Sequence, residues 1–149
     1  LREAGITPDE SDLDARLLYE GDFLESGGAA GLAQLLERRV PFSALACAND
    51  EMAVGAMAVA RRRGLNVPAN LSIVGVDNAP ISRYVYPKLA TVDYPIAEMS
   101  RMAATWVLRN AYGDDSAELQ HMFEPAVIER ESVRMVLRSQ PPATRGICK

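Results

Sequence analysis

The chain has 149 residues, of which 48% are hydrophobic and 24% charged, as in an ordinary globular domain with a buried core. Its 16 Lys and Arg residues are outnumbered by 20 Asp and Glu residues, and the net charge of −4 disfavours a surface that binds nucleic-acid phosphates. No uncharged apolar run is long enough to cross a membrane, and the first residues lack the layout of a secretory signal, so we expect a cytoplasmic protein.

Few residues are available for metal, redox or nucleophilic chemistry. His121 is the single histidine, and Cys47 and Cys148 are the two cysteines. We expect Cys47 to be a small core residue and Cys148 to be an exposed thiol near the end of the chain. The sequence shows no metal-ligand cluster, no glycine-rich phosphate loop and no nucleophile–base pair. We therefore expect no bound metal, no cofactor and no enzymatic activity.

Hydrophobic patterning predicts strands that alternate with helices. The expected strands are largely apolar on both faces, as parallel strands are when they are buried within a sheet. Short connections between such elements produce right-handed βαβ units. The sequence therefore predicts an α/β fold with a parallel sheet flanked by helices. The expected strands are 15–19, 43–48, 71–76, 90–93 and 125–130, and the expected helices are 26–40, 50–64 and 95–112.

Three features mark the ends of the expected helices. Pro41 stops the first helix because proline has no N–H to donate. Asn49 or Asp50 is placed to cap the free N–H groups of the second helix. Pro95 suits the first residue of the third helix, where the missing N–H costs nothing.

Ligands of open parallel sheets bind beyond the carboxyl ends of the strands. The residues that follow the first three expected strands include Phe23, Asn49 and Asp77. An aromatic ring stacks on the C–H face of a sugar or on a base, an amide donates and accepts, and a carboxylate accepts from neighbouring hydroxyls. The alternative is that Phe23 is a core residue and that Asn49 and Asp77 form turns or cap helices.

Short sequence blocks follow one another in a characteristic order over residues 1–133. These blocks are Leu1-Arg2-Glu3-Ala4-Gly5-Ile6, Glu20-Gly21-Asp22-Phe23, Ala48-Asn49-Asp50-Glu51-Met52-Ala53, Leu71-Ser72-Ile73-Val74-Gly75-Val76-Asp77-Asn78, Tyr86-Pro87-Lys88-Leu89-Ala90-Thr91-Val92 and Glu129-Arg130-Glu131-Ser132-Val133. In this order they resemble the C-terminal, effector-binding region of the lactose-repressor/galactose-repressor (LacI/GalR) family of bacterial transcription regulators. Arg83-Tyr84 and the run 92–97 are most similar to the galactose repressor and isorepressor branch.

The resemblance implies a fold, a ligand and a site. The fold would be a periplasmic-binding-protein-like C-terminal subdomain, which is one wall of an incomplete two-lobed domain. The small-molecule effector would be a sugar rather than a purine. Phe23 would stack on it, and Asn49 and Asp77 would form hydrogen bonds with it. Asn78 and Ile96 would be further contacts.

The resemblance also implies partners. A homodimer would form through an interface that includes Val54, Met57 and Val85. Operator DNA would be contacted only through an N-terminal DNA-binding head that these residues do not include. The chain would then be the effector-binding and dimerising portion of a transcriptional repressor. The rival hypothesis is a fragment of a periplasmic sugar-binding protein, which shares the two-lobed fold.

The expected organisation is an effector-binding and dimerisation region over 1–133 and a disordered tail over 134–149. In the family, the segment that corresponds to 91–112 crosses into the N-terminal subdomain. Without the packing partners found there, its apolar face around Met99 and Trp106 would be exposed or covered by another chain.

Overall fold

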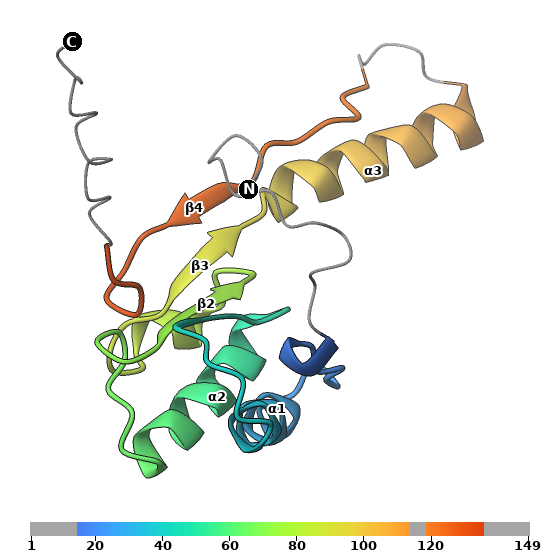
Figure 1. Cartoon of the computed structure of the whole chain (residues 1–149). Helices are drawn as coiled ribbons and strands as arrows, with labels where there is room; N and C mark the ends of the chain where they lie inside the picture. The colour runs from blue at the N-terminus through green and yellow to red at the C-terminus, as the bar shows by residue number, and fades with distance from the viewer. Residues whose placement is uncertain (1–14, 114–118, 136–149) are drawn as a thin grey trace, which may run out of the picture.

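A computed structural model of the chain describes residues 15–113 and 119–135 (Figure 1). The first sequence block, 1–6, and the tail from residue 136 lie outside the described residues. The elements, in chain order, are the 3-10 helix η1 (Ala15–Leu17), α1 (Glu25–Glu37), β1 (Ala44–Ala46), α2 (Asp50–Arg62), β2 (Ser72–Val76), the 3-10 helix η2 (Pro80–Arg83), β3 (Ala90–Asp93), α3 (Ile96–Tyr112) and β4 (Ala126–Ile128).

The sheet has the strand order β1-β2-β3-β4. β1, β2 and β3 are parallel, with Leu45 opposite Ile73 and Val74 opposite Ala90. β4 runs antiparallel to β3, so the sheet is mixed. The predicted α/β fold with a largely parallel sheet is therefore confirmed, and each of these strands lies within a run that the sequence predicts.

The strand predicted over 15–19 is wrong. Residues Ala15–Leu17 form η1, and the chain then continues without regular structure to the start of α1. The carbonyls of Arg16 and Leu18 accept hydrogen bonds from Nη1 of Arg38, at 3.1 and 2.6 Å, rather than from a neighbouring strand. A hollow lies between this segment and β1, and the segment adds no strand to the sheet.

The predicted helices are confirmed, with small changes at their ends. α1 ends at Glu37 rather than at Pro41, and Arg39 just beyond it adopts a left-handed conformation with φ 57°. Asn49 caps α2, as expected, and its side chain accepts from the N–H of Met52. Pro95 is the cap of α3 and not its first residue.

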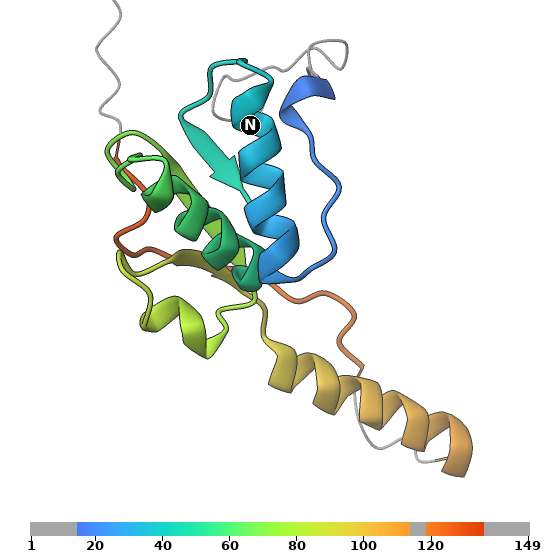
Figure 2. The same cartoon turned by 90° about the horizontal axis from the view of Figure 1, so that it is seen from below.

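α1 and α2 lie on the same face of the sheet and cross at close range (Figures 1 and 2). Two glycines allow the close approach, because a Cβ on Gly28 would overlap the backbone of Met52 and one on Gly55 would overlap the backbone of Glu25. α2 is the crossover between the parallel strands β1 and β2, so it packs directly on the sheet. The core between these layers contains Leu32, Ala53, Ala56, Met57, Val59, Ala60, Leu71, Ile73 and Leu89.

α3 projects away from the rest of the fold (Figures 1 and 2). None of its 17 residues is buried, and Met99 and Trp106 are 39% and 52% exposed. The apolar face of α3 is therefore exposed in the single chain. A hollow of about 400 Å³ lies between that face and the returning segment 119–123. Among the described residues, no helix is both long and apolar enough to span a bilayer.

Candidate functional site

The carboxyl ends of β1, β2 and β3 meet at one edge of the sheet because the three strands are parallel. Every residue that the sequence predicts as a ligand contact lies at or next to this edge. Asn49 follows β1, Asp77 and Asn78 follow β2, and Ile96 begins the helix after β3. Phe23 is brought to the same edge from the loop before α1 by a hydrogen bond from Asn49 to its carbonyl oxygen.

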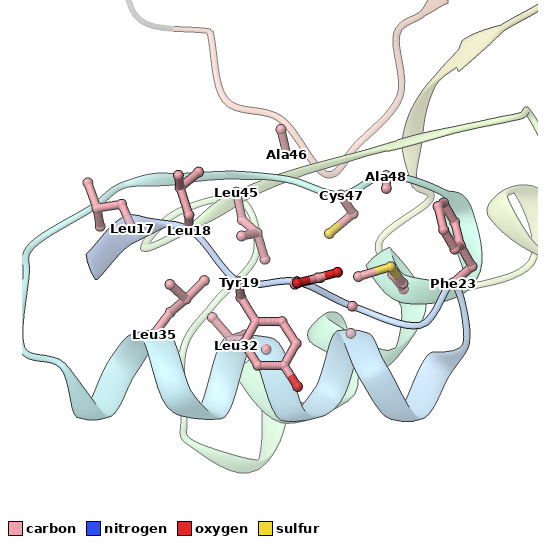
Figure 3. A pocket seen from close by; sticks show the side chains of 15 residues that line it. Leu17, Leu18, Tyr19, Phe23, Leu32, Leu35, Leu45, Ala46, Cys47 and Ala48 are labelled. Carbon is pink, nitrogen blue, oxygen red and sulfur yellow. The ribbon is translucent and has the colours of Figure 1, made fainter. Parts of the chain in front are cut away.

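A hollow of about 410 Å³ opens beside this edge, between the segment 17–23, α1 and β1 (Figure 3). Of the predicted ligand residues, Phe23 is the one that lines it, next to Ala48 at one end. Most other lining groups are apolar; the lining is Leu17, Leu18, Tyr19, Glu20, Gly21, Phe23, Gly28, Gly31, Leu32, Leu35, Leu45, Ala46, Cys47, Ala48 and Met52. A ligand with several hydroxyl groups would need the polar side chains at the strand ends as well.

Asn49 holds the Phe23 loop against α2. Its Nδ2 donates to the carbonyl of Phe23 at 2.8 Å, and its Oδ1 accepts from the N–H of Met52 at 2.9 Å. The capping interpretation of Asn49 is therefore confirmed, and its buried amide retains one N–H for another partner. Phe23 has φ 63° and a ring that is 65% exposed, which excludes the core interpretation of this residue.

The loop after β2 is locked through three consecutive backbone N–H groups. The N–H of Asp77 donates to the backbone of β3 at 2.8 Å, that of Asn78 to Oγ1 of Thr91 at 3.2 Å, and that of Ala79 to Oδ2 of Asp50 at 2.8 Å. Asp77 and Asn78 have φ values of 101° and 50°. These bonds hold both residues in a left-handed conformation that a free loop would leave.

Asp50 is a residue whose importance the sequence did not reveal. Its carboxylate is fully buried, and Oδ1 accepts from the hydroxyl of Thr91 at 2.7 Å while Oδ2 accepts from Ala79. Burial raises the pKa of Asp50, the negative charges of Asp77 and Glu51 raise it further, and the two hydrogen bonds oppose the rise. The sequence predicted a helix cap at Asn49 or Asp50. Asn49 is the cap, and the buried Asp50 accepts hydrogen bonds from the loop after β2 and from β3.

Arg130 is a second residue whose role the sequence did not reveal. Its Nη1 donates to the carbonyl of Leu89 at 2.6 Å and to Oγ of Ser82 at 2.9 Å. Its Nη2 donates to Oδ1 of Asn78 at 2.6 Å. The arginine therefore connects the segment after β4 to η2, to the residue before β3 and to the loop at the candidate site. In the sequence, the signal that could have indicated this role is a charged residue at the end of an apolar strand.

The remaining sequence predictions concern Cys47 and a possible metal. Cys47 packs against the core, and burial, with a smaller effect of the Asp50 charge, raises the pKa of its thiol to about 12. The raised pKa favours the protonated thiol over the nucleophilic thiolate at neutral pH. In the part of the chain that the structure describes, no group of three His, Cys, Asp or Glu side chains could hold a metal ion.

The predicted interface residues Val54, Met57 and Val85 line one hollow of about 380 Å³ between α2 and the loop after η2. Val54 and Val85 are half-buried at its surface. Met57 is only 7% exposed and belongs to the chain's own core. The structure thus brings the three residues together, while Met57 already has a packing role within one chain.

Comparison with known proteins identifies the family. The profile of the periplasmic binding protein-like domain matches residues 3–133. The chain belongs to this family. It is 41% identical over 133 residues to the HTH-type transcriptional regulator GalR of Escherichia coli strain K12. That similarity spans 89% of the chain and 37% of the regulator, so the chain covers little more than a third of the relative's length.

Solved structures agree with this assignment. A sugar-binding transcriptional regulator of the LacI family from Escherichia coli, complexed with phosphate, is 34% identical with a TM-score of 0.77, over 89% of this chain and 46% of that one. The transcriptional regulator CelR in its cellobiose complex is 28% identical with a TM-score of 0.77, over 89% and 39%. The resemblance to the effector-binding region of LacI/GalR regulators is confirmed, and the similar proteins are regulators, not enzymes.

Replacement of Asp50 by Asn tests the buried carboxylate. The two donors bind different oxygens of the carboxylate, and an amide has an NH2 group in place of one of them, so either Thr91 or Ala79 loses its acceptor and the free energy of unfolding falls by about 1–3 kcal/mol. Because folding raises the pKa of Asp50, the stability that this group contributes in the wild type is full below its ordinary pKa and decreases as pH rises through the raised value.

The stability deficit of Asp50→Asn is therefore greatest in acid and shrinks as pH rises through that interval, as urea denaturation at several pH values would measure. A deficit that grows with pH would contradict this account. Asp77→Asn changes an exposed carboxylate and is the matched control, with an expected cost below about 0.5 kcal/mol at neutral pH.

Proposed function

We propose that the chain is the effector-binding and dimerising portion of a bacterial transcriptional repressor and that its effector is a sugar. The observation that carries this proposal is the locked loop of Asp77 and Asn78, which lies at the same sheet edge as the exposed ring of Phe23. A carboxylate, an amide and an aromatic face form the combination that polyhydroxylated ligands require. The similar regulator CelR was solved with cellobiose, which supports a sugar as the ligand class.

The proposed regulator acts on operator DNA in the cytoplasm through residues outside these 149. The net charge of −4 supports a DNA-binding part outside these residues, because an acidic chain does not suit the phosphate backbone of DNA. In the mechanism, sugar binds between this lobe and a second lobe and favours one relative orientation of the two. That preference shifts the DNA-binding heads away from operator spacing. The proposal includes no enzymatic activity.

A chimera tests the ligand class and the site. In it, residues 1–133 replace the matching part of the Escherichia coli GalR regulator, which supplies the remaining length. We expect D-galactose to bind, and Phe23→Ala or Asp77→Ala to weaken the affinity about tenfold or more, since each removes contacts worth about 1.4 kcal/mol or more. Isothermal titration calorimetry measures the affinity.

Tyr84→Ala is the matched control for Phe23→Ala, because it removes another exposed aromatic ring, 82% exposed, that is not among the proposed ligand contacts. The chimera with Tyr84→Ala should bind D-galactose with the same affinity as the unmodified chimera. The proposed ligand class is wrong if a folded chimera binds none of D-galactose, D-fucose, D-ribose and cellobiose. The proposed site is wrong if both site variants bind galactose normally.

The proposed homodimer uses the hollow that Val54, Met57 and Val85 line. Val54→Glu places a charge on the half-buried rim, so we expect loss of the dimer with the fold retained. Met57→Glu buries that charge in the core, so we expect unfolding as well. Analytical ultracentrifugation and circular dichroism separate the outcomes. Ala30→Glu on the exposed side of α1 is the control, and a dimer that survives Val54→Glu would contradict the proposed interface.

We also propose that residues 91–112 cross to the second lobe in the whole regulator, which would cover the exposed face of α3. Trp106 is the single tryptophan and reports on this face directly. In the 149-residue chain, its half-exposed indole should be readily quenched by acrylamide. In the chimera with GalR, we expect a blue-shifted emission and weaker quenching because neighbouring residues exclude water. Identical spectra in the two proteins would argue against the crossing.

A further inference from the structure

The orientation of the Asn78 side chain is determined by its contact with Arg130. Nη2 of Arg130 lies 2.6 Å from Oδ1 of Asn78. A guanidinium has only donors, so the carbonyl oxygen of the amide must face it. One lone pair of that oxygen is thereby engaged, and both N–H donors on Nδ2 remain for another partner.

We propose that Arg130 is a positioning residue for ligand binding. It fixes the Asn78 amide as a donor beside the acceptor carboxylate of Asp77, and so makes this edge selective for neutral ligands with neighbouring hydroxyl groups. This inference rests on the proposed function and adds the chemical specificity of the site. Arg130 acts through Asn78 and not by touching the ligand.

Arg130 can hold Asn78 because it is itself held at several points. Its Nη1 donates to the carbonyl of Leu89 at 2.6 Å and to Oγ of Ser82 at 2.9 Å. Ser82 is fully buried, and its hydroxyl donates to the carbonyl of Ala79 at 2.6 Å. These bonds hold the planar guanidinium in place, so rotation of the Asn78 amide away from it would leave Nη2 without this acceptor, which opposes the rotation.

The pair formed by Asp77 and Asn78 is chemically selective. The carboxylate of Asp77 accepts and cannot donate, and the held amide of Asn78 offers a ligand the N–H donors of Nδ2 because its oxygen faces the guanidinium. A sugar hydroxyl can serve either partner, so two neighbouring hydroxyls satisfy both. A carboxylate or phosphate on the ligand would be repelled by Asp77, and an ammonium group would meet the N–H donors of Asn78. Backbone bonds from both residues keep the pair in place before a ligand arrives.

The test uses the 149-residue chain, labelled with ¹⁵N, and D-galactose and D-galactonate as the probes. Arg130→Met keeps the length of the side chain and removes every donor. Asn78→Asp keeps the contact with Arg130 and removes the donor toward the ligand, so it serves as a second variant if Arg130→Met fails to fold. Arg134→Met is the matched control, because Arg134 bonds to the carbonyl of Ala69 and not to Asn78.

Two nuclear magnetic resonance readouts follow the Asn78 Nδ2 group: its heteronuclear NOE, which measures rigidity, and its chemical shift during titration with each probe. In the wild type and in Arg134→Met, we expect a rigid amide that galactose perturbs and galactonate perturbs at least tenfold more weakly. In Arg130→Met, we expect a mobile amide and at least a tenfold weaker response to galactose. In Asn78→Asp, followed through backbone shifts at residues 77 and 78, we expect a similar loss of response.

Each contrary result is decisive. An amide that stays rigid in Arg130→Met overturns the positioning role, and so does a mobile amide with unchanged galactose affinity. An unchanged response in Asn78→Asp overturns the role of its donor. A wild-type response to galactose that includes neither Asp77 nor Asn78 overturns the specificity assigned to this pair. Failure of the GalR chimera to bind any sugar is separate from these results and overturns the proposed function itself.

Discussion

The buried carboxylate of Asp50 joins three segments that are far apart in the sequence. It begins α2, accepts from the backbone of Ala79 after β2 and accepts from the hydroxyl of Thr91 in β3. Gly75 makes room for it, since a Cβ there would overlap Oδ1 of Asp50. The carboxylate loses hydration and is satisfied by donors that the assembled sheet edge supplies, so its burial favours the complete edge over a partly formed one.

The other contacts at the edge depend on this arrangement. The bond to Ala79 sets the course of the loop after β2, which allows Asn78 to meet Arg130 from the segment after β4. On the other side, Asn49 precedes Asp50 and holds the Phe23 carbonyl while it caps α2. Side chains that the sequence separates by tens of residues thus meet with little remaining freedom, which is the condition for tight recognition of a small ligand.

The sequence predicted the elements with strong periodicity and clear end signals. β2, β3 and the Asn49 cap of α2 follow directly from apolar runs and from the chemistry of a capping amide. The strand over 15–19 could not be predicted correctly, because a strand requires a paired neighbour and local composition does not show whether one is in reach. The predicted contacts do gather at one edge, but the partners of Asp50 and Arg130 are long-range contacts, which no local pattern contains.

The apolar face of α3 is not buried by the described residues of this chain. None of its 17 residues is buried and its apolar face remains in water, so the helix lacks the packing that supplies most helical stability in proteins. The compact part of the fold buries its apolar residues between α1, α2 and the sheet, where the glycines at 28 and 55 allow close packing. One region is therefore stabilised by its own core, whereas α3 lacks one. The apolar face of α3 would add to the free energy of folding only where another surface covered it, because apolar area contributes when it is removed from water.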